Sequence, residues 1–134
     1  MLIQKNIIII IIIIIAVNGN MSLTEIDPDK IYFTHSKIRQ RFTGCNKTLD
    51  ETLNEIKNNI ISVHDLPRIT VYYDNKNDAY FSQNNRRLWV YKYCKKNNLL
   101  NNSNNMIGVL IKPMPLNKKY SKETCSLNAK VCLK

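Results

Sequence analysis

Residues 65–91 read DLPRITVYYDNKNDAYFSQNNRRLWVY, and the order of patterns in this segment restricts the fold more than any other part of the chain. Residues 69–73 are mostly β-branched or aromatic, which predicts a strand. A polar turn follows, and the mainly apolar residues 79–82 predict a returning strand, so that the two form a hairpin. Residues 86–97 then repeat apolar side chains at helical spacing and predict a helix directly after the hairpin.

Toward the N-terminus, the sequence predicts another helix over residues 49–60. Thr48 and Glu51 match a capping box, in which each side chain accepts a hydrogen bond from the other residue's backbone N–H. The apolar residues of this segment recur at helical spacing and predict a core-facing stripe, formed by Leu49, Leu53, Ile56 and Ile60. Before this helix, residues 31–34 predict a short strand.

Toward the C-terminus, the asparagine runs at 97–98 and 101–105 predict a loop, because such side chains cannot bury apolar surface. Residues 107–111 are apolar and predict a buried strand. The tail alternates apolar residues and predicts an added edge strand, at Leu127, Ala129 and Val131. Together these patterns predict an α+β fold in one domain over residues 20–134, with a short mixed sheet packed against two main helices.

The composition fits one small domain with one core, since 44% of the 134 residues are hydrophobic and 22% are charged. The three glycines exclude a glycine-rich phosphate loop of the Walker or dinucleotide type. The net charge of +10 favours polyanions: nucleic acid, nucleotide phosphates or an anionic membrane surface. Many small basic proteins bind nothing acidic, so charge alone leaves both interpretations open. No cysteine and histidine pattern has zinc-ligand spacing, and we expect no metal site.

The turn Asn84-Asn85-Arg86-Arg87 is the one concentrated chemical signal in the chain. Backbone N–H groups at a helix start can hold an anion. Arg86 and Arg87 lie in the first helical turn, where their charge opposes the helix dipole unless something negative is bound or packed beside them. The alternative is that each arginine pairs with a carboxylate such as Asp65 or Glu55 and only stabilises the fold.

On the predicted helix, apolar and basic side chains lie on opposite arcs. The apolar arc is expected to face the core and consists of Trp89, Val90, Tyr93 and Cys94. The basic arc consists of Lys92, Lys95 and Lys96, which either extend an anion-binding surface or form an ordinary solvated face.

The N-terminal residues 1–19 have the layout of a secretory signal peptide: one lysine, then an unbroken apolar run, then Asn18-Gly19. The apolar run is shorter than the ~20 residues that span a bilayer, so no stable membrane span is expected. The protein is therefore predicted to enter the secretory pathway. The alternative is that the domain starts at Met21 and stays in the cytoplasm or nucleus.

Secretion would place four cysteines in an oxidising compartment, where an even number predicts two disulfides with three possible connectivities: Cys45, Cys94, Cys125 and Cys132. Secretion would also make three sequons candidates for N-glycosylation, at Asn20, Asn46 and Asn101.

The predicted order of elements is a strand, a capped helix, a hairpin, a second helix and an apolar strand. This order resembles the ParB/sulfiredoxin superfamily over roughly residues 27–112, most specifically over residues 65–91. The chain is most similar to small uncharacterised eukaryotic members of that superfamily. They share a Phe-Thr-His-Ser-x-Ile-Arg start, here at 33–39, and a Phe-Ser-x-Asn-Asn-Arg-Arg-Leu core, here at 81–88. The tail at 123–127 is similar too.

The resemblance implies a nucleotide-phosphate site at the turn. Arg86 and Arg87 match the paired arginines of ParB-type domains, which bind CTP, while Asn84 replaces a glycine of that pattern. His35 and Arg39 belong to a segment that packs near the turn in this superfamily. His35 is a candidate for phosphate contact or for acid–base chemistry, or a structural residue that caps a strand.

Asn85 occupies the position of the acidic ParB residue and of the sulfiredoxin cysteine. An asparagine can act neither as a base nor as a thiolate, so we expect neither nucleotide hydrolysis nor sulfiredoxin activity.

Three hypotheses follow. The first is a module that binds nucleotide phosphate without turnover, with a nucleotide as its only candidate cofactor. The second is a nucleic-acid-binding protein or ParB-like nuclease, although the sequence has no carboxylate cluster for a divalent metal. The third is a secreted, disulfide-stabilised protein that retains no ligand site.

Overall fold

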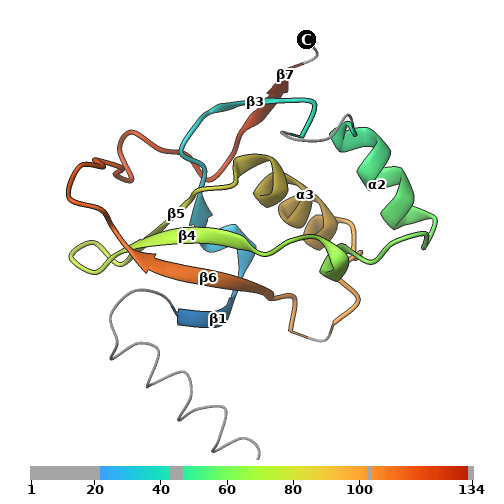
Figure 1. Cartoon of the computed structure of the whole chain (residues 1–134), viewed down its shortest axis with the longest axis horizontal. Coiled ribbons are helices and arrows are strands. Elements are labelled where there is room, and N and C mark those ends of the chain that lie inside the picture. The colour runs from blue at the N-terminus through green and yellow to red at the C-terminus, as the bar shows by residue number, and fades with distance from the viewer. Residues whose placement is uncertain (1–21, 43–46, 103, 133–134) are drawn as a thin grey trace, which may run out of the picture.

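The computed structural model describes residues 22–42, 47–102 and 104–132 (Figure 1). The predicted signal peptide at 1–19 lies outside the described residues, and so do Asn20, Cys45 and Asn46. No helix among the described residues is long and apolar enough to cross a membrane.

A five-stranded mixed sheet forms the centre of the molecule, in the order β1-β6-β4-β5-β2. The middle strand is β4 (Ile69–Asp74), which runs antiparallel to β5 (Ala79–Ser82) and parallel to β6 (Ile107–Pro113). The edge strand β1 (Ser22–Ile26) is antiparallel to β6, and β2 (Ile31–Tyr32) at the other edge is parallel to β5. The predicted hairpin and the predicted buried strand are therefore confirmed.

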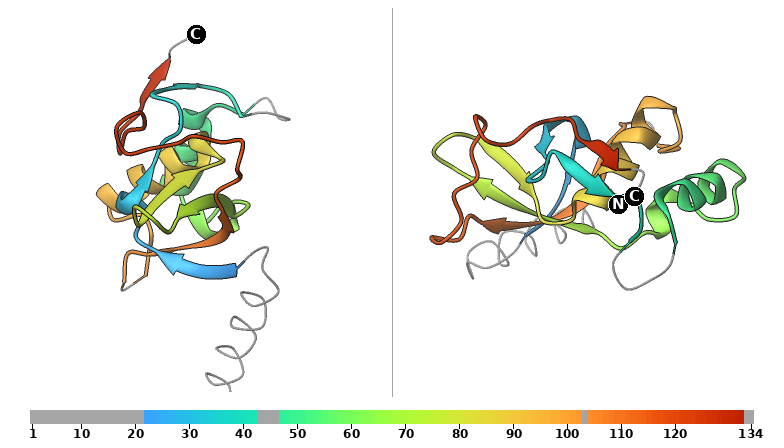
Figure 2. Two further views of the ribbon diagram at one scale, coloured as in Figure 1. Left: turned by 90° about the vertical axis from the view of Figure 1, so that its left-hand side faces the viewer. Right: turned by 90° about the horizontal axis from the view of Figure 1, so that it is seen from above.

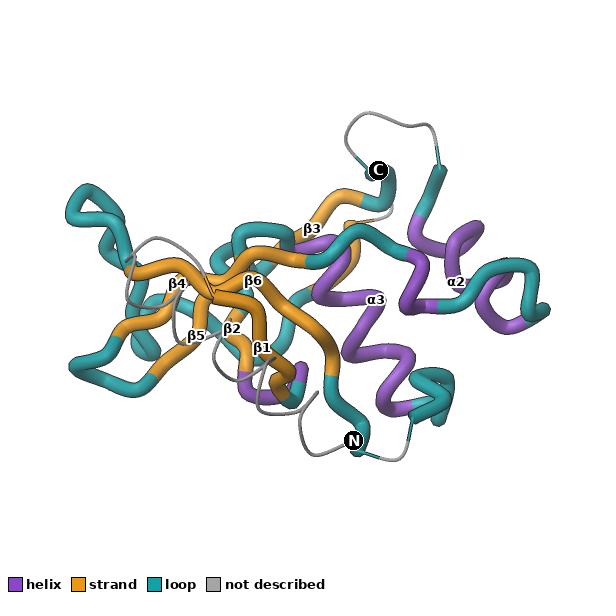
Figure 3. Tube along the Cα trace, turned by 60° about the horizontal axis from the view of Figure 1, so that its bottom comes forward, coloured by secondary structure: helices purple, strands orange, loops and turns teal. Residues whose placement is uncertain are grey.

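Two α-helices lie on one side of this sheet, α2 (Leu49–Lys57) and α3 (Asn85–Lys96). Helix α3 lies next to the sheet, and α2 lies beyond α3 (Figures 1 and 3). Two short 3₁₀ turns complete the fold: η1 (Pro28–Lys30) lies between β1 and β2, and η2 (Val63–Asp65) lies between α2 and β4. The predicted α+β fold, a short mixed sheet with two main helices, is confirmed.

A second, two-stranded sheet joins distant parts of the sequence. Strand β3 (Lys37–Arg39) pairs in parallel with β7 (Lys130–Cys132), and Figure 2 shows this pair beside the C-terminus. The strand predicted in the tail thus exists, but it pairs with β3 and not with the central sheet. Strands β3 and β7 have only three residues each, so their pairing with one another could not be predicted from the sequence.

Helix α2 begins where the capping pattern predicts and ends earlier than predicted. Thr48 Oγ1 accepts a hydrogen bond from the backbone N–H of Glu51 at 3.1 Å. The helix ends at Lys57, and Asn59 adopts a left-handed conformation with φ 57°. Asparagine tolerates this conformation better than other non-glycine residues, so it favours a helix end here. Ile60, predicted to belong to the apolar stripe, is 69% exposed beyond the helix.

The main core lies between the sheet and the helices, and the buried residues of α3 in it are Leu88, Val90, Tyr91 and Cys94. Trp89 and Tyr93, predicted to face the core, are half-buried and stack on each other with ring centroids 5.6 Å apart. A smaller core around Tyr72 and Phe81 lies apart from it. This smaller core borders the cleft described next.

Candidate functional site

One cleft of about 770 Å³ brings together all six residues that the sequence predicts as phosphate contacts. Two segments supply them: the turn that opens α3 and the chain between β2 and β3. The six residues are His35, Arg39, Asn84, Asn85, Arg86 and Arg87. Their spatial grouping agrees with the prediction that these segments pack together.

The start of α3 forms one wall of the cleft, and its backbone N–H groups lack a side-chain cap. Asn84 occupies the N-cap position, but its Oδ1 accepts a hydrogen bond from the backbone N–H of Thr70 at 2.8 Å. No acidic residue lies in the first turn of α3. Helix α2 differs, since Thr48 caps it and two acidic residues follow. The positive end of α3 is therefore left to solvent or to a ligand.

Asn85 holds the β2–β3 segment against this helix start. Its Oδ1 accepts a hydrogen bond from the Thr34 backbone N–H at 3.1 Å, and its Nδ2 donates to Thr34 Oγ1 at 2.9 Å. Thr34 Oγ1 donates in turn to the carbonyl of Ser82 at 3.0 Å. Both the oxygen and the nitrogen of the Asn85 side-chain amide thus bind Thr34, and they hold the β2–β3 segment at the cleft. The role of Thr34 could not be predicted from the sequence, because nothing in its local sequence marks it as a partner of Asn85.

Arg86 and Arg87 donate hydrogen bonds to backbone carbonyl groups. Arg86 Nη1 donates to the carbonyl of Arg41 at 2.8 Å. Arg87 Nη1 donates to the carbonyls of Pro67 and Arg68, at 2.8 and 2.9 Å. A carbonyl group orients a guanidinium without neutralising its charge.

The carboxylates considered as partners of these arginines are used elsewhere. Glu55 forms an ion pair with Lys47 at 2.6 Å. Asp65 accepts a hydrogen bond from the Ser62 backbone N–H at 2.9 Å and caps η2. Neither Asp65 nor Glu55 forms an ion pair with Arg86 or Arg87 among the described residues.

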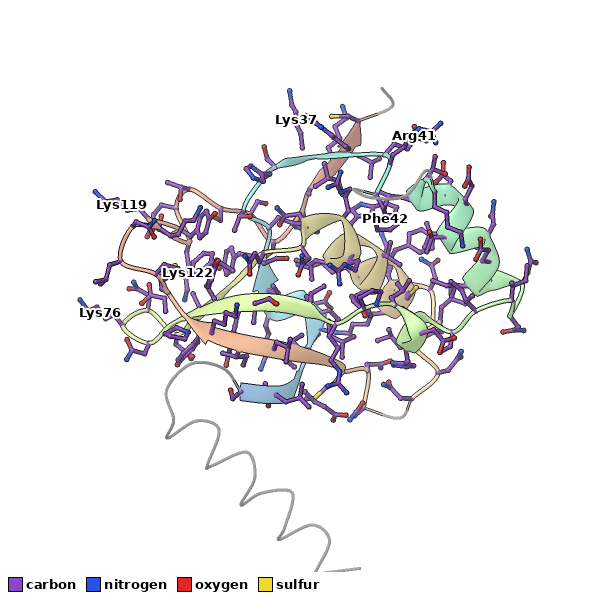
Figure 4. All side chains as sticks on the ribbon, viewed as in Figure 1. Lys37, Arg41, Phe42, Lys76, Lys119 and Lys122 are labelled. Carbon is purple, nitrogen blue, oxygen red and sulfur yellow. The ribbon has the colours of Figure 1, made fainter. Side chains whose placement is uncertain are left out.

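The remaining lining makes the cleft strongly electropositive. Lys37 and Lys118 line it together with the three arginines, and among the described residues no aspartate or glutamate does. His35 and Arg39 are exposed at this surface. Figure 4 shows Lys37 and Arg41 toward opposite ends of the segment that carries β3. Cationic side chains around a concave surface concentrate the positive potential there, which attracts anions.

The basic arc predicted on α3 is mostly engaged in the fold. Lys95 forms ion pairs with Asp27 at 2.8 Å and with Asp29 at 2.6 Å. Lys92 Nζ donates to the carbonyl of Leu127 at 2.7 Å and lies 4.9 Å from the centroid of the Phe33 ring. Burial lowers the pKa of Lys92 to about 8. An extended anion-binding surface on this arc is therefore not supported, because two of its three lysines have internal partners.

The described cysteines, Cys94, Cys125 and Cys132, are free thiols. No disulfide joins them, because they lie in different parts of the fold. Cys94 is fully buried in the main core, where burial raises the pKa of its thiol to about 11. Cys125 borders the smaller core, and Cys132 ends β7. These three thiols give no support to the disulfide-stabilised alternative.

Two further predictions concern N-glycosylation and metal binding. Asn101, one of the predicted glycosylation sites, is exposed. No group of three or more histidine, cysteine, aspartate or glutamate side chains gathers in the described part of the chain in a way that could hold a metal ion.

No protein-family model, curated protein or solved structure matches this chain. The resemblance to the ParB/sulfiredoxin superfamily therefore remains a prediction from sequence.

Proposed function

We propose that this protein binds the phosphate groups of a small polyanion, such as a nucleotide, in the cleft at the start of α3, and that it does so without turnover. One observation carries the proposal. Five lysine or arginine side chains and an uncapped helix N-terminus line a single cleft in which the described residues include no carboxylate. Helix N-termini and guanidinium groups are the protein groups that hold phosphate oxygens best.

The proposed lack of turnover is supported by the chemistry of the lining. Hydrolysis of a phosphate ester or anhydride needs a group that activates water or a metal ion that polarises the phosphate. Asn85 is engaged with Thr34 and has no basic atom to offer. His35 is the one described histidine that lines the cleft, and no described aspartate or glutamate lines the cleft to orient its imidazole.

The test is the double variant Arg86→Ala, Arg87→Ala in the full chain, with affinity for ATP and for inorganic triphosphate measured by calorimetry. We expect both affinities to fall at least tenfold. The matched control is Lys76→Ala, Lys96→Ala, which removes the same charge at exposed positions outside the cleft and should change affinity less than twofold. Equal affinities in the two double variants would contradict the proposal.

A second pair of substitutions guards against misfolding, since the two arginines also hold carbonyl groups of the fold. Lys37→Glu, Arg39→Glu reverses two exposed charges at the cleft. It should leave the melting temperature nearly unchanged while it weakens triphosphate binding. Wild-type protein should gain ~2.7 kcal/mol of stability at a ligand concentration 100 times the dissociation constant.

A second candidate function is nucleic-acid binding, favoured by further lysines outside the cleft. Lys76, Lys119 and Lys122 are exposed at the end of the molecule that holds the β4–β5 turn and the chain after β6 (Figure 4). Phosphate contacts to a nucleic acid release counterions, so the logarithm of the affinity should fall linearly with the logarithm of the salt concentration. An oligonucleotide affinity that ignores salt would rule this candidate out.

A further inference from the structure

The chain that follows β6 presents a leucine to solvent. The side chain of Leu116 is completely exposed. It lies in a turn that is closed by a hydrogen bond from the Lys118 backbone N–H to the carbonyl of Pro115, at 3.1 Å. Pro113 and Pro115 each fix a backbone φ angle just before Leu116. The backbone around Leu116 is therefore constrained.

The same segment is attached to the fold on both sides of the turn. Before it, Met114 packs on the smaller core, and its backbone N–H donates to the carbonyl of Tyr73 at 3.2 Å. After it, the Tyr120 ring stacks on the ring of Tyr72, with centroids 6.3 Å apart. Because both ends are anchored, the exposure of Leu116 is a property of the folded structure.

Lysines accompany this turn. Residues 112–122 contain four lysines and no acidic residue. Lys119 and Lys122 are exposed, and so is Lys76 in the β4–β5 turn. The β4–β5 turn and the chain after β6 lie at the same end of the molecule, where these three lysines are labelled (Figures 1 and 4). An exposed apolar side chain and several cations thus share one end of the protein.

Two of the acidic side chains at this end are held within the β4–β5 turn. Asp74 accepts hydrogen bonds from the Lys76 backbone N–H at 3.0 Å and from Asn77 Nδ2 at 2.8 Å. Asp78 accepts a hydrogen bond from the Tyr73 hydroxyl group at 3.0 Å. Glu123 is exposed next to Lys122 in the sequence. These carboxylates are short or engaged in the turn, whereas lysine side chains are long enough to extend past them.

An anionic lipid bilayer matches both features of this end. Its headgroups attract lysine ammonium groups, and the boundary of its hydrocarbon region accepts an apolar side chain. The phosphates of a nucleic acid would account for the lysines and leave the exposure of Leu116 without a role. Lipid is therefore the partner that fits the lysines and the leucine together.

We propose that this end of the molecule binds an anionic membrane surface, with Leu116 at the hydrocarbon boundary and Lys76, Lys119 and Lys122 against the headgroups. We call these four residues the basic tip. None of them lines the cleft at the start of α3, so this inference goes beyond the proposed function and does not depend on it. Attachment of this kind is peripheral and reversible, and salt weakens its electrostatic part.

The first test measures binding of the full-length protein to vesicles of phosphatidylcholine with and without phosphatidylserine. We expect Leu116→Ser to weaken binding to the anionic vesicles about tenfold, because the burial of one apolar side chain is lost. The matched control is Ile60→Ser, which removes an exposed apolar side chain that follows α2, at the other end of the molecule (Figure 1). Equal affinities in these two variants would overturn the proposal.

A second pair of variants tests the lysines. Lys119→Ala, Lys122→Ala should weaken binding to the anionic vesicles about tenfold. The control Lys96→Ala, Lys130→Ala removes the same charge at exposed positions outside the basic tip and should have a much smaller effect. An equal loss in the two double variants would show that net charge alone governs binding, and it would overturn the proposed orientation.

A local measurement is also needed, because the apolar run at residues 7–17 can bind lipid by itself. Nanodiscs that contain phosphatidylserine and a nitroxide-labelled acyl chain broaden the NMR signals of nearby protons. We expect the methyl signals of Leu116 to broaden and those of Ile60 to stay sharp. Sharp Leu116 signals in the bound protein would overturn the proposal, whichever segment attaches the protein to the lipid.

A single-stranded oligonucleotide distinguishes lipid from nucleic acid as the partner of the basic tip. Leu116→Ser should leave both oligonucleotide affinity and triphosphate affinity unchanged, and the melting temperature should stay close to that of the wild type, since the side chain is exposed. The opposite result would be wild-type vesicle binding by Leu116→Ser together with a loss of oligonucleotide affinity in Lys119→Ala, Lys122→Ala. It would assign the lysines to a nucleic acid and overturn the proposal.

Discussion

At the scale of single residues, Lys92 has an unusual environment for a lysine. Its ammonium group is half-buried between the Phe33 ring and the carbonyl of Leu127. Loss of hydration lowers its pKa from 10.5 to about 8; Asp29 and Asp27 oppose this shift, and Lys95 adds to it. Folding therefore works against protonation of this amine.

The consequence is a stability that rises with pH. Between pH 8 and 10.5 the unfolded chain binds more protons at Lys92 than the folded protein does, so the free energy of unfolding increases across this window. Lys92→Met removes the charge and keeps the length of the side chain. We expect its stability relative to the wild type to be highest near pH 7 and to decline toward pH 10, as measured by urea unfolding.

The exposed Lys96, one turn further along α3, provides the control for this effect. Lys96→Met makes the same substitution at this exposed position and is measured over the same pH range for comparison. A constant difference between Lys92→Met and the wild type from pH 7 to 10 would mean that Lys92 keeps an ordinary pKa.

At the scale of elements, the two helices begin in opposite ways. Helix α2 has a capping threonine and two acids in its first turn, whereas α3 has neither a side-chain cap nor an acid there. An uncapped helix start loses stability that a cap would supply. The difference is consistent with a division of roles, in which α2 contributes to stability and α3 presents its N-terminus to the cleft.

Two substitutions separate these roles. Thr48→Ala should lower the free energy of unfolding by about 1 kcal/mol and leave triphosphate affinity unchanged. Gln83→Glu, an exposed position in the cleft just before α3, should lower triphosphate affinity several-fold without loss of stability, because a carboxylate is favourable near a helix N-terminus and repels phosphate.

Asn75→Asp, an exposed position in the β4–β5 turn, adds the same charge outside the cleft and serves as the control for Gln83→Glu. A similar loss of affinity in both variants would show that net charge, and not the helix start, governs binding.

The elements also show what the sequence could predict. Strands β4 and β5 and helix α3 were predictable because each has a periodic or compositional pattern and short connections. The pairing of β3 with β7 was not, because it joins residues more than 90 positions apart through two three-residue strands.

Some residues of the candidate site could also be predicted from the sequence, and others could not. The turn at Arg86 and Arg87 stands out locally, because two arginines oppose the helix dipole. Thr34, Lys118 and Tyr120 reach the cleft only through tertiary packing. The sequence shows which chemistry Asn85 cannot perform, whereas its hydrogen bonds to Thr34 depend on the tertiary structure.

At the scale of the whole molecule, the cleft depends on the tail. Strand β3 carries Lys37 and Arg39 to the cleft, and its parallel partner β7 comes from the last described residues. Where β7 begins, the Lys130 backbone N–H donates to the carbonyl of Ser36 at 2.8 Å. The tail thus stabilises one wall of a site to which none of the residues of β7 contributes a side chain.

Lys130→Pro tests this dependence, because proline removes that N–H donor. We expect triphosphate affinity to fall several-fold and stability to fall by about 1 kcal/mol, the usual worth of one hydrogen bond. Lys130→Ala keeps the donor and loses the same side-chain charge, and its affinity should equal that of the wild type. Wild-type affinity in Lys130→Pro would show that β3 holds its position without β7.

The β3–β7 pair also sets an order of events during synthesis on the ribosome. The hairpin, both helices and every side chain that lines the cleft are translated before Lys130. Strand β3, which carries Lys37 and Arg39, cannot pair until β7 has been synthesised. A nascent chain should therefore acquire full ligand affinity only after residue 132 has left the exit tunnel.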